Sequence, residues 1–132
     1  MRVGYSSWSL DVTLGWDARY DPECITITPM ANDAAFQLSS AFKRAGPITD
    51  QEIELQASLE PEWGGSSPVS YAKFRGAAVS FVSEGVYWWR LWLAHEKTLL
   101  IVTVNCLPER FAAYEPDVLR MLRSLEPEHV DA

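Results

Sequence analysis

Cysteine is scarce in this sequence: the 132 residues contain two, Cys24 and Cys106, which lie far apart. Two cysteines cannot form the disulfide framework that staples small secreted domains, so the fold must depend on an apolar core. A chain of this length buries roughly two-thirds of its unfolded surface, which is enough for such a core. We therefore expect both cysteines to be buried as small apolar residues.

Basic residues are also few and scattered. The chain has 11 Lys and Arg residues against 18 Asp and Glu residues, which gives a formal net charge of −7. No basic run is longer than Lys43-Arg44. Nucleic acid and anionic membrane surfaces both require concentrated positive charge, so we expect neither as a partner.

Long apolar segments are missing as well. The longest apolar run, residues 99–104, is far too short to span a bilayer, and the N-terminal MRVGYSSWSLDV has no signal-peptide core or cleavage site. The sequence shows no repeat and no linker between domains. We therefore expect a single cytoplasmic domain over residues 1–125 and a flexible acidic tail over residues 126–132.

Motifs that carry known chemistry are absent too. Gly64-Gly65 lacks the lysine of a phosphate-binding loop, and His95-Glu96 has no second histidine nearby to complete a metal site. Cys106 and His95 are a nucleophile and a base by residue type. The predicted strand pairing separates them by roughly 27 Å, which is beyond hydrogen-bond reach. We predict a non-enzymatic protein without a metal or a cofactor.

The residues that are present predict a mixture of strands and helices. Alternating or β-branched segments predict strands over residues 3–12, 24–28, 34–43, 71–84, 86–95 and 98–107. Gly15-Trp16-Asp17 is expected to form a turn, and residues 60–70 a loop. Thr49-Asp50-Gln51-Glu52 matches a capping box and favours a helix over residues 50–59. The apolar residues of that segment also alternate, which leaves a strand as the alternative.

The C-terminal segment has the pattern of an amphipathic helix. Residues 108–125 are predicted to be helical, because apolar residues recur at spacings of three and four from Phe111 to Leu125. Pro116 interrupts this pattern, so we expect a short helical turn followed by a main helix that begins near Pro116. The fold class is therefore α+β, with a curved antiparallel sheet of about six strands and helices packed on both faces.

Residues 87–94, YWWRLWLA, combine four aromatic side chains with an arginine. If Glu84-Gly85 and Glu96-Lys97 are two-residue turns, the cross-strand partners follow by counting. Trp88 then lies opposite Phe81 and Asn105, Arg90 opposite Val79 and Thr103, and Trp92 opposite Ala77 and Ile101. A bulge at Gly85 would change this assignment.

The two faces of these strands differ in character. One face is almost wholly apolar and is predicted to form the main core under the C-terminal helix. The other face mixes Trp88 and Trp92 with Arg90, Thr103 and Asn105. Two interpretations of this mixed face stay open: a second packed layer under the helix over residues 50–59, or a partly open binding groove.

The order of these elements resembles the PsbP-like α/β/α sandwich group. The resemblance covers about residues 3–125 and is carried by YWWRLW at residues 87–92, LLIVTVNC at residues 99–106 and the closing Ser124-Leu125. The group includes Ran-binding import factors, photosystem PsbP proteins and bacterial DcrB-like domains. It implies a curved antiparallel sheet between helices and a role in binding other proteins, as in small bacterial partners that chaperone secreted effectors.

We predict a bacterial cytoplasmic protein-binding module that acts as an adaptor, chaperone or immunity-like partner. Aromatic residues and arginine dominate contact energies at interfaces. The predicted contact residues are Trp63, Trp88, Arg90, Trp92, Thr103 and Asn105. A small apolar ligand in the same aromatic cleft is the alternative, followed by an enzyme with an unrecognised site. A homodimer also stays open.

Overall fold

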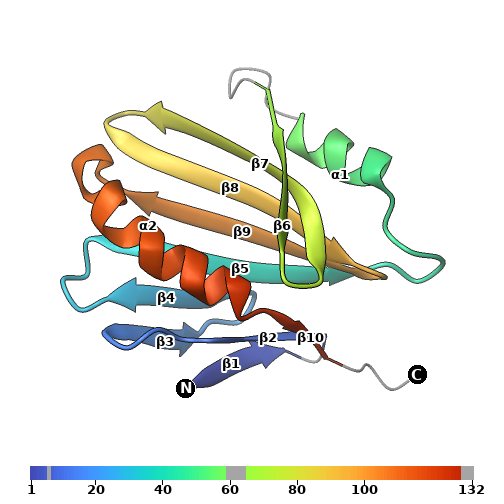
Figure 1. Cartoon of the computed structure of the whole chain (residues 1–132), viewed down its shortest axis with the longest axis horizontal. Helices are drawn as coiled ribbons and strands as arrows, with labels where there is room; N and C mark the ends of the chain where they lie inside the picture. Colours follow the sequence, from blue (N-terminus) through green and yellow to red (C-terminus); the bar gives the residue numbers. More distant parts are fainter. Residues whose placement is uncertain (6, 59–64, 129–132) are drawn as a thin grey trace.

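The computed structural model describes residues 1–5, 7–58 and 65–128. These ranges contain ten strands and two helices (Figure 1). In chain order they are β1 (Arg2–Tyr5), β2 (Trp8–Asp11), β3 (Trp16–Tyr20), β4 (Ile25–Pro29), β5 (Ala34–Phe42), α1 (Asp50–Ala57), β6 (Ser67–Tyr71), β7 (Phe74–Ser83), β8 (Val86–His95), β9 (Thr98–Cys106), α2 (Pro108–Arg123) and β10 (Glu126–Pro127). The fold is α+β and mostly sheet.

The main sheet has seven antiparallel strands in the order β3-β4-β5-β9-β8-β7-β6. Its centre is a meander in which Ser83 pairs with Val86 and His95 pairs with Thr98. Glu84 and Gly85 have φ values of 53° and 78°, as a two-residue hairpin turn requires. The cross-strand partners predicted for the aromatic strand are therefore confirmed, without a bulge at Gly85.

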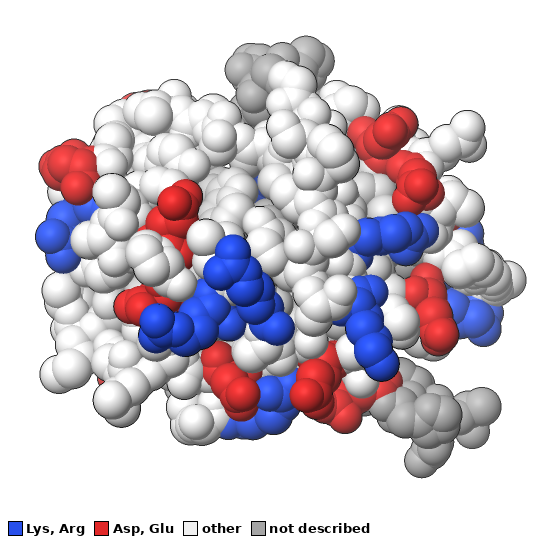
Figure 2. Space-filling view, viewed as in Figure 1, with Lys and Arg blue, Asp and Glu red and all other residues white. Residues whose placement is uncertain are grey.

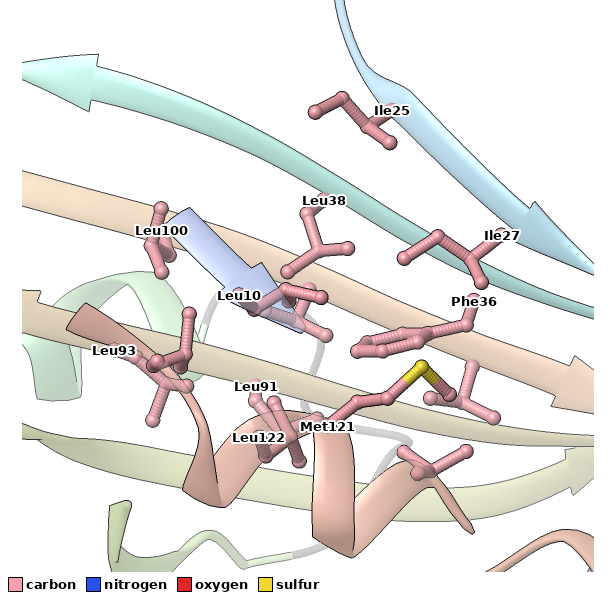
Figure 3. Close-up of a cluster of buried hydrophobic side chains, with 14 of the residues drawn as sticks. Leu10, Ile25, Ile27, Phe36, Leu38, Leu91, Leu93, Leu100, Met121 and Leu122 are labelled. Carbon is pink, nitrogen blue, oxygen red and sulfur yellow. The ribbon is translucent and has the colours of Figure 1, made fainter. Parts of the chain in front are cut away.

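One face of this sheet carries the main core. It is covered by α2 and by a second, three-stranded sheet of order β1-β2-β10 (Figure 1). Figure 3 shows Leu10 of β2 and Met121 and Leu122 of α2 among the sheet side chains Phe36 and Leu91. All five are fully buried, and burial of such apolar surface is the dominant stabilising contribution.

Helix α1 packs on the opposite face, at one end of the sheet. The Thr49 hydroxyl accepts from the Glu52 N–H at 3.2 Å, and a Glu52 carboxylate oxygen accepts from the Thr49 N–H at 3.1 Å. The capping box, and with it the helix, is confirmed. Ile53 and Ala57 bury against the sheet. With eight residues, α1 covers only part of this face, so the predicted sandwich with helices over both faces is incomplete.

Several strand predictions need correction. Residues 3–12 form a hairpin instead of one strand, because Tyr5 pairs with Trp8. The turn predicted at Gly15-Trp16-Asp17 is correct for Gly15 only, because Trp16, which is buried, and Asp17, which is exposed, are the first residues of β3. Ala72, with φ 55°, divides the predicted strand over 71–84 into β6 and β7, and β6 begins inside the predicted loop over 60–70. The main sheet therefore has seven strands instead of six.

The last helix is continuous, contrary to the predicted break. Pro116 lies inside α2 on its exposed side, where the carbonyl that loses its partner can bond to water. Val118, Met121 and Leu122 anchor the helix to the sheet, and this packing offsets the cost of the proline. Neither described helix is long and apolar enough to cross a membrane.

The segment after α2 also differs from the prediction of a tail that begins at residue 126. Glu126 pairs with Ser9 and Pro127 with Trp8, so β10 extends the small sheet. The Glu128 N–H then donates to the Ser7 carbonyl at 3.0 Å. Residues 129–132 lie outside the described ranges.

Candidate functional site

The candidate site is the face of the seven-stranded sheet that points away from α2, which we call the open face. Side chains alternate along each strand, so the pairing register places its members in rows across the sheet. They are Ala77, Val79 and Phe81 of β7, Trp88, Arg90 and Trp92 of β8, Ile101, Thr103 and Asn105 of β9, and Ala35, Gln37 and Ser39 of β5.

At one end of the open face, α1 turns the surface into a second small core. Trp92 is 4% exposed and packs in a cluster with Ile53 and Ala57 of α1. The guanidinium carbon of Arg90 lies 5.7 Å from the Trp92 ring centroid, within cation–π range. For Trp92, packing under the helix is therefore the correct interpretation.

The other end of the open face has a different environment. Trp88 is only half-buried and belongs to neither of the two buried apolar clusters in the described part of the chain. Its ring stacks on Phe81, with a centroid separation of 6.3 Å and an interplanar angle of 10°. Asn105 is the cross-strand neighbour of Trp88 and is also half-buried. This end presents two parallel aromatic rings beside an amide.

A polar row crosses the middle of the open face. Arg90 pairs with Thr103, Thr103 pairs with Gln37, and Gln37 pairs with Thr26. The Gln37 amide donates to the Thr26 hydroxyl at 3.4 Å. That hydroxyl donates to Asp21 at 2.8 Å and is the main reason why the pKa of Asp21 is below its usual value. The row supplies donors and acceptors next to the aromatic pair, as recognition of a peptide backbone requires.

The predicted site residues are thus only partly brought together. Trp88, Arg90, Thr103 and Asn105 are half-buried neighbours on the open face, and Trp92 is buried. Trp63 lies outside the described residues. The sequence prediction did not include Phe81 or Gln37 in the site. Phe81 could have been identified from the sequence, because the predicted hairpin register places it opposite Trp88.

The nucleophile and base candidates lie far from each other. His95 sits at the turn end of the β8–β9 hairpin, and Cys106 pairs with Tyr87 at the other end. Burial raises the pKa of the Cys106 thiol, which disfavours the reactive thiolate. Among the described residues, no group of three or more His, Cys, Asp or Glu side chains could hold a metal ion.

A separate cleft of about 390 Å³ lies where α1 meets β6 and β7. Its lining includes the charged side chains of Asp50, Glu54 and Arg75, and Arg75 already bonds to Asp50 and to the Ile48 carbonyl. Of the predicted contact residues that the structure describes, none lines this cleft. The side of the molecule that carries α2, opposite the open face, shows acidic and basic side chains interspersed (Figure 2). The surface charge on that side is therefore not of a single sign.

Comparison with known proteins identifies a similar fold but does not identify a family. No family model and no curated protein matches the sequence. A crystal structure of a Bacteroides thetaiotaomicron protein matches 92% of this chain with a TM-score of 0.69 and 13% identity. The match covers 45% of that protein, so this chain spans less than half its length.

A second solved structure bears on the resemblance to PsbP. The solution structure of cyanobacterial PsbP from Synechocystis aligns over 95% of both chains, with a TM-score of 0.46 and 9% identity. This similarity is too weak to support an argument, and the PsbP-like family assignment stays a prediction. The Bacteroides match, at 13% identity, shows that this chain shares its fold with a solved protein and shows nothing about activity.

Proposed function

We propose that this protein is a non-catalytic binding module that holds an apolar segment of another protein on the end of its open face that α1 does not cover. The observation that carries the proposal is the stacking of Trp88 on Phe81, on a sheet whose other face is a closed core. Trp88 is half-buried and belongs to neither apolar cluster, and Phe81 packs at the margin of the smaller cluster. A rigid aromatic surface with little conformational entropy to lose is suited to contact a partner.

The neighbours of the aromatic pair define the chemistry of the partner. Trp88 and Phe81 favour an aliphatic or aromatic side chain of the partner. Arg90, Thr103 and Asn105 supply hydrogen bonds for backbone amides and for a carboxylate beside the apolar residue. A partner segment that alternates apolar and polar or acidic residues matches this surface, which is consistent with an adaptor or chaperone for an effector-like protein.

The test compares capture by the wild-type chain with capture by Trp88→Ala. Phe42→Ala is the matched control, because Phe42 is a 52% exposed aromatic residue on β5 whose side chain points to the other side of the sheet. A partner enriched from native cells is then purified, and its affinity for each variant is measured by calorimetry. Loss of a central tryptophan contact costs about 2 kcal/mol or more, which is a roughly 30-fold weaker Kd.

Two results would count against the proposal. One is a partner whose affinity for the Trp88→Ala variant equals its affinity for the wild type. The other is a chain recovered with a small apolar molecule and without a protein, whose retention depends on Trp88. The second result would establish the small-ligand alternative at the same surface.

A further inference from the structure

The two outer edges of the seven-stranded sheet are β3 and β6, and they differ in how well they can pair with another strand. A free edge exposes backbone N–H and C=O groups and is a template for strand addition unless the sequence blocks it. The exposed groups are identified by the alternation of bonded and non-bonded pairs in an antiparallel ladder.

The β6 edge is blocked by a proline. Tyr71 pairs with Phe74 across a two-residue turn, so these two residues form a hydrogen-bonded pair. By alternation, the backbone groups of Ser70 and Pro68 point outward, and Pro68 has no N–H to donate. This edge therefore offers a single outward donor.

The β3 edge is not blocked. Hydrogen bonds at both ends of the β3–β4 ladder show which of its residue pairs are hydrogen-bonded. The Asp21 N–H donates to the Cys24 carbonyl at 2.8 Å, and the Met30 N–H donates to the Gly15 carbonyl at 3.1 Å. Alternation between these two points leaves the backbone groups of Trp16, Ala18 and Tyr20 pointing outward.

Most of these outward groups are available for a new strand. The Trp16 N–H is used within the chain, where it donates to the Thr13 carbonyl at 3.1 Å. In the described part of the chain, the outward backbone groups of Ala18 and Tyr20 and the Trp16 carbonyl have no hydrogen-bond partner. The edge thus keeps two donors and three acceptors.

The side chains of β3 are complementary to a second copy of the same strand. Asp17 and Arg19 are exposed, and both point to the open-face side, one on each side of Ala18. In an antiparallel pair centred on Ala18, Asp17 lies opposite Arg19 of the second copy, and Arg19 lies opposite Asp17 of the second copy. The adjacent symmetric registers place either Asp17 opposite Asp17 or Arg19 opposite Arg19, which is unfavourable.

Exposed apolar side chains flank this edge. Leu14 is 99% exposed just before β3, and Met30, at 84%, is bonded to the same turn through Gly15. At the other end Tyr20 is 56% exposed and contacts the ring of Tyr5 in β1 at 5.7 Å. In Figure 1, β1 and β3 lie together at one extremity of the molecule. Such a gathering of apolar side chains around an open edge is typical of an interaction surface.

We propose that the protein forms a two-fold symmetric dimer through antiparallel pairing of β3 with β3 of a second copy, centred on Ala18. Each Ala18 exchanges N–H and C=O bonds with Ala18 of the second copy, and each Tyr20 N–H donates to the Trp16 carbonyl of the other chain. Two Asp17–Arg19 pairs fix the register. The two sheets become one continuous sheet, and the proline-blocked β6 edges end it, which closes the assembly as a dimer. This inference does not depend on the proposed function.

Sedimentation equilibrium of the wild type and of five variants tests the dimer. Ala18→Pro removes the central outward donor, which has no partner within the chain, and should give a monomer. Ser70→Pro is the matched control, because it places the same change on the β6 edge and should leave the dimer intact. Circular dichroism and thermal melting establish that each variant is folded.

The charge series is independent of the proline variants. Asp17→Arg and Arg19→Asp each place like charges opposite each other twice, and each should weaken the dimer about tenfold or more. The double variant Asp17→Arg/Arg19→Asp restores opposite pairs and should recover the wild-type dissociation constant. Three results would each overturn the proposal. The first is a wild type that stays monomeric up to the highest soluble concentration, and the second is a folded Ala18→Pro variant that is still dimeric. The third is a double variant that dimerises as weakly as the single charge variants.

Discussion

Replacing Trp92 and Trp88 separately by alanine tests the division of the open face into an end packed under α1 and an end that α1 does not cover. Trp92 is 4% exposed and is surrounded by the apolar cluster of α1 and the sheet. A tryptophan side chain buries about 150–250 Å², and at about 25 cal/mol per Å² this burial stabilises the fold by about 4–6 kcal/mol. The usual range for Trp→Ala in a core is about 3–5 kcal/mol.

Trp88 should behave differently because it is only half-buried and lies outside both apolar clusters. Its truncation removes less buried surface than the truncation of Trp92, which predicts a smaller loss, of about 2–3 kcal/mol. The stacking contact with Phe81 contributes to that loss.

The assay is urea unfolding followed by far-UV circular dichroism, which does not depend on the fluorescence of the deleted residue. Leu55→Ala serves as the surface control, because Leu55 is 63% exposed on α1 and its truncation should change stability by about 0.5 kcal/mol or less. A Trp92→Ala cost below about 1 kcal/mol, or equal costs for the two tryptophans, would show that α1 does not divide the face into two different environments.

Three further changes follow from local geometry. Thr49→Ala removes the cap of α1 and should lower the free energy of unfolding by about 1 kcal/mol in urea titrations. Gly76→Ala should cost about 1–3 kcal/mol, because the added Cβ would lie 1.6 Å from the Trp92 carbonyl oxygen and the strands must shift. The Tyr114 hydroxyl holds the pKa of Asp33 below its usual 3.8, so this carboxylate stabilises the fold above that pH and the contribution is lost as the pH falls through the lower folded value. Asp33→Asn should therefore reduce stability at neutral pH and make it less sensitive to acid, as melting temperatures measured across the acid range would show.

The elements that the sequence predicted well are those governed by local rules. The meander β7–β8–β9 follows from two short turns, and once those turns are fixed, every cross-strand pair follows by counting. The helix α1 follows from the capping box at Thr49 and Glu52, although its apolar residues also alternate as in a strand. In both cases residues close in sequence determine the geometry.

The missed elements depend on contacts between distant segments or on a signal that was not used. In β3, the alternation of Trp16, Ala18 and Tyr20 with two charged residues is a strand pattern that the neighbouring glycine concealed. In α2, the packing of Val118 and Met121 against the sheet keeps the helix continuous through Pro116, and only the tertiary structure shows this packing. The pairing of β10 with β2 joins the two ends of the chain and has no local signal.

The different environments of Trp88 and Trp92 follow from a mismatch of lengths. Helix α1 has eight residues and spans about 12 Å at a rise of 1.5 Å per residue. Strand β8 has ten residues and spans about 33 Å at about 3.3 Å per residue. The two tryptophans are four residues apart on the same face, or about 13 Å, which is more than the length of α1, and α1 packs on Trp92. The alternation of YWWRLWLA therefore places both tryptophans on one face, whereas the length of the covering helix decides which of them is core.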